Sequence, residues 1–238
     1  MACFVLVHGA WGGSYGFRAV RRLLQADGHE VLTPALTGIG ERSHLTGPHV
    51  DLSLHVLDVV NTIRYEDLDD VVLLGFSYGG MVVTGALDHV GDRVRELVYL
   101  DAFVPADGES VASLGGAPPT PFPEIGASWL VPATPREYED AAVGAWSNLR
   151  RTAQPVATFT EPVRLSHPLD EQPFGRTYVR ATAGPHPAAF DAAAAHARES
   201  PAWRYHEIHT THTVPENRPG ELAEILRDVA AGRVTVRP

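Results

Sequence analysis

The sequence predicts an α/β domain, a mainly parallel sheet of about six strands with helices on both faces and an inserted lid. Short apolar runs alternate with helical patterns along the chain. A Gly-x-Ser-x-Gly motif at 75–79 directly follows the apolar run at 71–74. The 238 residues are 44% apolar and 20% charged, which suits one large domain of this class.

The expected elements follow in order along the chain. The predicted strands are 2–7, 30–33, 71–74, 95–100, 177–181 and 204–208. The predicted helices are 18–26, about 51–65, one beginning near 81, 188–198 and 216–230. Asp51 is expected to cap the second helix, and Gly28 to follow the end of the first. Strands that alternate with helices favour parallel pairing.

Residues 105–175 break this alternation. They are rich in Pro, Ala and Gly, with aromatic residues at Phe122, Trp129, Trp146 and Phe159. Irregular segments of this length in compact domains are usually functional or disordered. The aromatic content favours a lid over a site, so we expect a core of 1–104 and 176–238 with a cap of 105–175.

Composition excludes several classes of function. The net charge is −10 without a basic tract, which argues against a nucleic-acid partner. All 19 basic residues are Arg, which excludes Schiff-base chemistry on lysine. The single Cys3 cannot form an internal disulfide. No signal peptide precedes the first strand and no apolar stretch approaches the roughly 20 residues of a membrane span, so a cytoplasmic location without a membrane partner is expected.

Ser77 is the candidate nucleophile. A serine on a tight turn from strand to helix has its hydroxyl exposed at the top of the sheet, and the flanking glycines leave room for the turn. The simpler alternative is a serine that only closes the turn. The apolar run before the motif and the helical pattern after it favour the nucleophile.

Two backbone N–H groups are candidates for an oxyanion hole. One belongs to Tyr78, directly after the nucleophile, and the other to the loop at 8–13 that follows the first strand. We assign the second donor to Ala10; the alternative is that this loop is a flexible connector.

The general base is expected late in the chain, after the last strand. His206, His209 and His212 compete for this role. His212 lies beyond the strand and is best placed over the top of the sheet. A zinc site on these three residues is disfavoured because the spacing is not that of a helical metal motif and no fitting carboxylate is evident.

Several segments resemble the branch of the α/β-hydrolases that holds pyrethroid hydrolases, plant esterases and hydroxynitrile lyases. They include FVLVHGAW at 4–11, LTGIGER at 36–42, GFSYGGM at 75–81 and YLDAFVP at 99–105. Matches at 129–132, 154–159, 203–205 and 219–222 extend the resemblance over nearly the whole chain. The resemblance implies a mainly parallel sheet with a cap, no cofactor, and a catalytic histidine at His212.

The departures from this branch concern the reaction. Its members commonly have His directly before the nucleophile, a position that Phe76 occupies in this chain. His212 also lacks the usual neighbours of the branch and has threonine on both sides. Its lyases use Thr and Lys at the positions of Gly9 and Thr213, so a cyanohydrin lyase is disfavoured.

The triad acid is also missing from its usual place. Relatives have Asp after the strand that here leads into Gly184, and no carboxylate stands there. Asp101, at the end of the 95–100 strand, is the candidate replacement, although it could merely cap the lid entrance. Asp191 and Glu216 are weaker alternatives.

These residues predict a serine hydrolase that cleaves a carboxylic ester of an apolar small molecule through an acyl-enzyme on Ser77. The expected pocket residues are Trp11, Phe76, Phe103 and Trp129. No metal and no cofactor are expected, and the oligomeric state is left open, a homodimer being one option. One alternative is a non-hydrolytic enzyme of the same fold, a cyclase or lyase of secondary metabolism. Another is a non-catalytic ligand-binding protein.

Overall fold

The computed structural model describes residues 1–116 and 129–233. A six-stranded sheet has the order β2-β1-β3-β4-β7-β8, and every neighbouring pair is parallel. Its strands are β1 (Cys3–Val7), β2 (Glu30–Leu32), β3 (Val71–Phe76), β4 (Val94–Leu100), β7 (Gly175–Ala181) and β8 (Trp203–Ile208). The predicted fold class is therefore confirmed.

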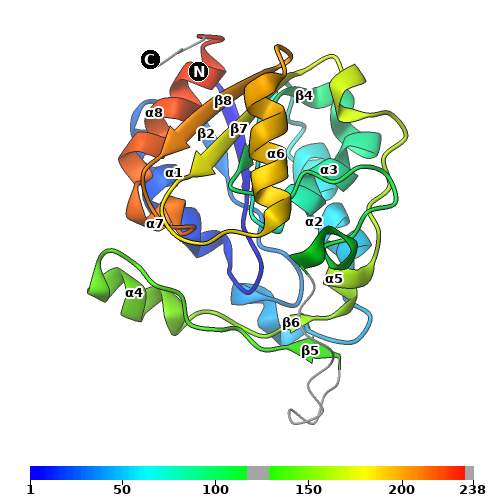
Figure 1. Ribbon diagram of the computed structural model, residues 1–238, viewed down its shortest axis with the longest axis vertical. Helices are drawn as coiled ribbons and strands as arrows, with labels where there is room; N and C mark the ends of the chain where they lie inside the picture. Colours follow the sequence, from blue (N-terminus) through cyan, green and yellow to red (C-terminus); the bar gives the residue numbers. More distant parts are fainter. Residues whose placement is uncertain (117–128, 234–238) are drawn as a thin grey trace.

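Helices cover both faces of this sheet (Figure 1). They are α1 (Arg18–Ala26), α2 (Leu52–Tyr65), α3 (Gly79–Val90), α6 (Ala188–Glu199), α7 (Val214–Asn217) and α8 (Pro219–Ala230). Successive side chains of a strand point to opposite faces. In β1, Phe4 and Leu6 join the core under α1 and α8, whereas Val5 and Val7 join the core under α2, α3 and α6.

The predicted helix over 216–230 is wrong in one respect, because the structure divides it into α7 and α8. Arg218 lies at the break with non-helical backbone angles (φ −131°, ψ 52°). A residue before proline is disfavoured in the helical region, and Pro219 follows here. The predicted cap of α2 is confirmed, since Asp51 accepts a hydrogen bond from the Leu54 N–H at 2.8 Å.

The segment 105–175 contains more regular structure than its sequence suggests. β5 (Leu130–Val131) pairs antiparallel with β6 (Gln154–Pro155), and α4 (Ala141–Asn148) and α5 (Ala157–Thr160) lie in the same segment. In Figure 1, β5, β6 and α4 lie together beyond one end of the sheet. Phe122 lies outside the described residues. Within the described part of the chain, no helix has the length and hydropathy of a membrane span.

Backbone contacts attach this segment to the loop after β1. The Thr152 N–H donates to the carbonyl of Trp11 at 3.1 Å, and the Trp11 indole N–H donates to the carbonyl of Val131 at 3.1 Å. The Trp11 backbone N–H donates to the side chain of Gln154 at 2.8 Å. The position of this loop therefore depends on the described part of segment 105–175, the expected lid, as well as on the sheet. We call residues 129–175 the lid segment.

Candidate active site

Ser77 lies on a sharp turn between β3 and α3. Its φ is +57°, in the left-handed region that L-residues rarely adopt, and its N–H donates to the carbonyl of Leu100 at 3.2 Å. A Cβ on Gly79 would lie 2.6 Å from the Val7 carbonyl oxygen, so only glycine lets α3 begin this close to β1. The turn holds the Ser77 side chain at the carboxyl edge of the sheet.

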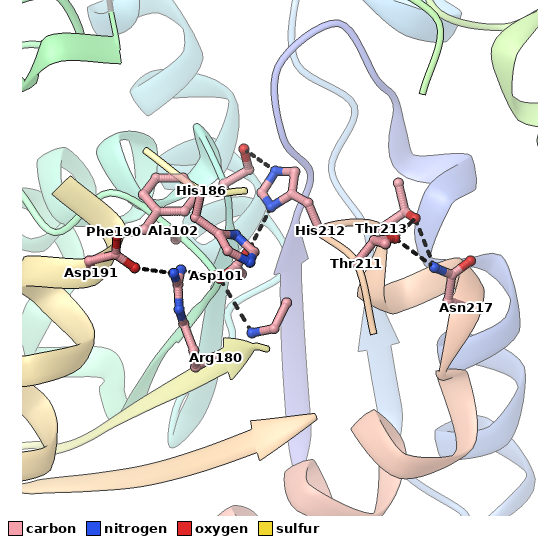
Figure 2. Close-up of polar contacts among 12 residues, drawn as sticks. Asp101, Ala102, Arg180, His186, Phe190, Asp191, Thr211, His212, Thr213 and Asn217 are labelled. Atoms are coloured by element: carbon pink, nitrogen blue, oxygen red, sulfur yellow. Dashed lines mark hydrogen bonds and ion pairs between the residues drawn. The ribbon is translucent and has the colours of Figure 1, made fainter. Parts of the chain in front are cut away.

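The structure brings Ser77, His212 and Asp101 into one hydrogen-bonded chain. The Oγ of Ser77 lies 2.9 Å from Nε2 of His212. On the other side of the ring, Nδ1 of His212 lies 2.6 Å from Oδ2 of Asp101 (Figure 2). The three residues follow β3, β8 and β4, and the carboxyl ends of parallel strands meet at one edge. Nδ1–H donates to the carboxylate, which leaves Nε2 to accept the serine proton.

Asp101 is held by two further donors. Its side chain is fully buried, and its Oδ1 accepts from Nη1 of Arg180 at 2.8 Å and from the Ala181 N–H at 3.3 Å. Arg180 also pairs with the exposed carboxylate of Asp191. Gly184, where the resemblance led us to expect the acid, is exposed. The carboxylate of Asp101, directly after β4, therefore lies beside His212, the candidate base, while Arg180 of β7 supplies its counter-ion.

His186 is a second imidazole beside this carboxylate. Its Nδ1 lies 3.2 Å from Oδ2 of Asp101, and its side chain is 6% exposed. Neither ring nitrogen makes a hydrogen bond of acceptable geometry to a described residue. We therefore treat His186 as a close electrostatic neighbour and not as a donor. The ligand atoms of Asp101, His186 and His212 lie within 4.8 Å of one another, so this group has the spacing to hold a metal ion.

The structure does not support the alternative of a zinc site at His206, His209 and His212. His206 belongs to β8, and Nδ1 of His209 lies 3.1 Å from the hydroxyl of Thr182. Among the described residues these three do not form a potential metal-binding group.

The charges at the site suit a neutral base beside an ionised acid. Burial opposes ionisation of Asp101, but the adjacent imidazoles of His186 and His212 outweigh it and hold its pKa well below the usual range. Burial, assisted by the Arg136 guanidinium, lowers the pKa of His212 to about 4 against the opposing effect of Asp101. The His212 side chain is still 23% exposed, so water reaches the ring.

The loop after β1 runs directly against the nucleophile. A Cβ on Gly9 would lie 2.9 Å from Cβ of Ser77, so the backbone here approaches closer than any side chain permits. His8 fixes the start of the loop, since its Nε2 accepts from the Leu36 N–H at 3.2 Å. The backbone N–H groups of Ala10 and Tyr78 donate to no other residue in the described part of the chain.

Two supporting residues were not identified from the sequence. His55 is fully buried, and its Nε2 lies 2.8 Å from the Thr37 carbonyl, so that nitrogen donates and Nδ1 accepts from the Tyr78 hydroxyl at 2.9 Å. Asn217 donates to the hydroxyls of Thr211 and Thr213 on either side of His212, at 3.1 and 3.0 Å (Figure 2). The contacts of His55 join segments that are distant in the sequence, so no local signal could have identified it. Asn217 lies only six and four residues after the two threonines, and this close spacing to His212 is the signal that could have identified it.

The four expected pocket residues have different surroundings. The ring of Phe76 lies 4.9 Å from that of His212, centroid to centroid. Trp11 packs on Phe159 of α5 at 5.3 Å, whereas Phe103 packs on Phe190 at 4.7 Å and is only 6% exposed. The backbone carbonyl of Trp129 accepts from the Val156 N–H. Substrate contact by these four residues stays a prediction.

A serine on an elbow between strand and helix, with a histidine and a carboxylate at the carboxyl edge of a parallel sheet, defines the class of nucleophile-elbow hydrolases. The chain belongs to the alpha/beta hydrolase family, whose model matches residues 4–225.

Known relatives agree with this assignment. The chain is 38% identical over 242 residues to a carbendazim hydrolyzing esterase of Nocardioides sp. (strain SG-4G), covering 95% of this chain and 98% of that protein. It is 32% identical over 105 residues to an alpha-hydroxynitrile lyase of Arabidopsis thaliana, covering 43% of this chain and 40% of the lyase. The fold resembles that of an extracellular alpha/beta-hydrolase from a Paenibacillus species, with a TM-score of 0.77, 22% identity, and coverage of 95% and 98% of the two chains. The branch expected from the sequence is thereby confirmed.

Proposed function

We propose that the protein hydrolyses a carboxylic ester of an apolar small molecule through an acyl-enzyme on Ser77. The observation that carries this proposal is the unbroken chain of hydrogen bonds from Ser77 through His212 to Asp101. Ester hydrolysis is also the activity named for the relative that matches this chain over nearly its whole length. The rings of Phe76 and Phe190, whose centroids lie 4.9 and 5.7 Å from that of His212, support an apolar substrate.

In the acylation half, Oγ of Ser77 attacks the ester carbonyl carbon as its proton passes to Nε2 of His212. The carbonyl oxygen becomes an oxyanion that accepts hydrogen bonds from the N–H groups of Ala10 and Tyr78. The ionised Asp101 stabilises the imidazolium at Nδ1. The intermediate then collapses, the C–O bond of the ester breaks, and Nε2–H protonates the departing alkoxide to give the alcohol.

In the deacylation half, water replaces the alcohol. His212, neutral again, takes a proton from this water as its oxygen attacks the acyl carbon. Collapse of the second oxyanion breaks the bond to Ser77, whose Oγ recovers the proton from His212. The products are one alcohol and one carboxylic acid, and no electron donor or acceptor is needed.

The structure weakens the case for a non-hydrolytic reaction. That alternative arose because no acid stands at Gly184, and Asp101 supplies a carboxylate at the right atom of His212. The lyase relative matches less than half of this chain. A threonine at Gly9, as the lyases have, would place its Cβ against Ser77.

The proposal is tested by covalent labelling and turnover together. A fluorophosphonate probe should label the protein at Ser77, and p-nitrophenyl esters should be hydrolysed with a burst of p-nitrophenol when deacylation is slow. Ser77→Ala should lose both. His212→Ala should lose turnover. His209→Ala is the matched control, because the His209 ring lies outside the Ser77–His212–Asp101 chain, with its Nδ1 3.1 Å from the Thr182 hydroxyl. Unchanged turnover in Ser77→Ala would remove the proposal.

A further inference from the structure

A small cavity of about 30 Å³ lies behind the loop after β1. The loop residues 8–10 and 12–13 form one wall, Phe76 and Thr213 form another, and the lid segment contributes Arg136 and Arg151. An ordered water needs roughly 10–15 Å³ of such space, so the cavity has room for about two waters or one small polyatomic ion.

Three polar atoms in the cavity wall are buried without a hydrogen-bond partner among the described residues. They are the hydroxyl of Tyr15, Nη2 of Arg151 and Oε2 of Glu216. These groups come from the turn after β1, from the lid segment and from α7. A buried polar group without a partner is costly, and three around one cavity indicate that something bridges them.

The charge of the cavity indicates which kind of molecule bridges these three atoms. Arg136 and Arg151 both line it, and neither forms an ion pair with a carboxylate in the described part of the chain. Among the described residues of the lining, Glu216 is the only one with an acidic side chain. Two guanidinium groups against one carboxyl give the described lining an excess of positive charge, which favours an anion over water.

The titratable groups around the cavity respond to one another. Burial raises the pKa of Glu216 to about 7, although Arg136 and Arg151 lower it. Burial, together with Arg151, lowers the pKa of Arg136 to about 10. Burial also raises the pKa values of Tyr15 and Tyr138. His8 lines the same cavity. The Glu41 carboxylate lies against Gly13 of the cavity wall, and the charge of Asp101 raises the pKa of Arg136 from outside the lining.

We propose that this cavity binds one small monoanion of the carboxylate class, held by Arg136 and Arg151, with the protonated carboxyl group of Glu216 donating a hydrogen bond to it. A carboxylate accepts from both guanidinium groups, and the Tyr15 hydroxyl supplies a further donor. Binding is therefore accompanied by uptake of a proton at Glu216. The anion comes from solution or belongs to the substrate itself. The proposal does not depend on ester hydrolysis, because binding is measured without turnover.

The test is calorimetric titration of the intact protein with sodium formate at constant ionic strength, with formamide as the neutral probe of equal size. We expect formate, and not formamide, to bind, and its affinity to fall between pH 6 and pH 8 as Glu216 ionises. Arg151→Met should weaken formate binding about tenfold or more, since it removes a charged hydrogen bond. Arg150→Met is the matched control, because Arg150 is exposed and stacks on Trp146 at 4.0 Å.

Two more variants keep the test decisive. Glu216→Gln should retain formate binding but lose its pH dependence, and Arg136→Met replaces Arg151→Met if the latter does not fold. The proposal is overturned if formate binds no better than formamide, or if Arg151→Met and Arg150→Met behave alike.

A second comparison identifies the source of the anion. Wild type and Arg151→Met are compared on ethyl butyrate and on monoethyl succinate, which carries a free carboxylate. A selective loss of kcat/KM for the succinate ester assigns the cavity to a substrate carboxylate. Equal effects on both esters, with formate binding intact in wild type, assign it to a free anion.

Discussion

Asp101 and His212 are joined by a 2.6 Å hydrogen bond although 111 residues separate them. Asp101 follows β4, whereas the relatives' acid is expected after β7, the next strand of the sheet. The N–H of Asp101 donates to the Val179 carbonyl at 2.7 Å, and its φ is +40°. The tight turn directs the carboxylate of Asp101 towards β7. Asp101 therefore reaches, from the end of β4, the place beside His212 that an acid after β7 would occupy.

Arg180 should be needed for the stability of the fold, because it neutralises a buried carboxylate. Its side chain is 8% exposed and pairs with the fully buried Asp101. Arg180→Met leaves that carboxylate without its counter-ion, which should reduce the free energy of unfolding by roughly 3–5 kcal/mol. Urea denaturation at pH 7 measures this. Asp191→Asn, at the exposed end of the same network, should unfold close to wild type. Equal stability of all three proteins would show that Arg180 does not balance a buried charge.

Gly9 should tolerate no side chain. Its Cβ would lie 2.9 Å from Cβ of Ser77, so Gly9→Ala must displace the loop that carries Ala10. Because misplacement by about 1 Å can cost 10²-fold, we expect kcat to fall by that order while the fold persists. Gly12→Ala is the control, since its Cβ would meet only ordinary contacts at 3.5 Å or more. Comparable activity of the two variants would contradict a close approach of this loop to Ser77.

On acidification, kcat/KM should decline only well below neutral pH. Only neutral His212 accepts the serine proton, so activity is lost as pH falls through the pKa of His212. Burial and Arg136 lower that pKa to about 4, below the usual 6.5. The kcat/KM for an uncharged ester should therefore stay constant from pH 8 to about pH 6 and decline near pH 4. Arg136→Met should move the decline upwards. A wild-type midpoint at or above pH 6.5 would contradict this electrostatic description.

Much of the fold could be predicted from local sequence patterns. The apolar runs identified all six strands of the main sheet, and the motif at 75–79 located the turn that holds Ser77. These features depend on neighbouring residues, which a sequence displays directly. The division of the last helix at Arg218 was missed although Pro219 signals it.

Contacts between distant segments were harder to predict. The absence of a carboxylate at Gly184 pointed to Asp101, but nothing in the sequence indicated that Arg180 and His186 would flank it. Arg136, Arg151 and Glu216 lie in three unremarkable stretches of sequence and meet only when the lid segment folds over the loop after β1. Such clusters are set by tertiary packing and have no local signature.

The role of Asp101 as the acid of the triad is tested most directly by Asp101→Asn with a p-nitrophenyl ester. Asparagine fits the same space but cannot stabilise the imidazolium, and the equivalent loss in a serine protease lowers kcat about 10⁴-fold. We expect kcat of Asp101→Asn to fall by about that factor at pH 7, although the variant retains Ser77. The control variant Asp191→Asn should have a kcat close to that of wild type. An Asp101→Asn enzyme that keeps kcat within about tenfold of wild type would contradict the assignment, because a positioned charge at this site should contribute more than that.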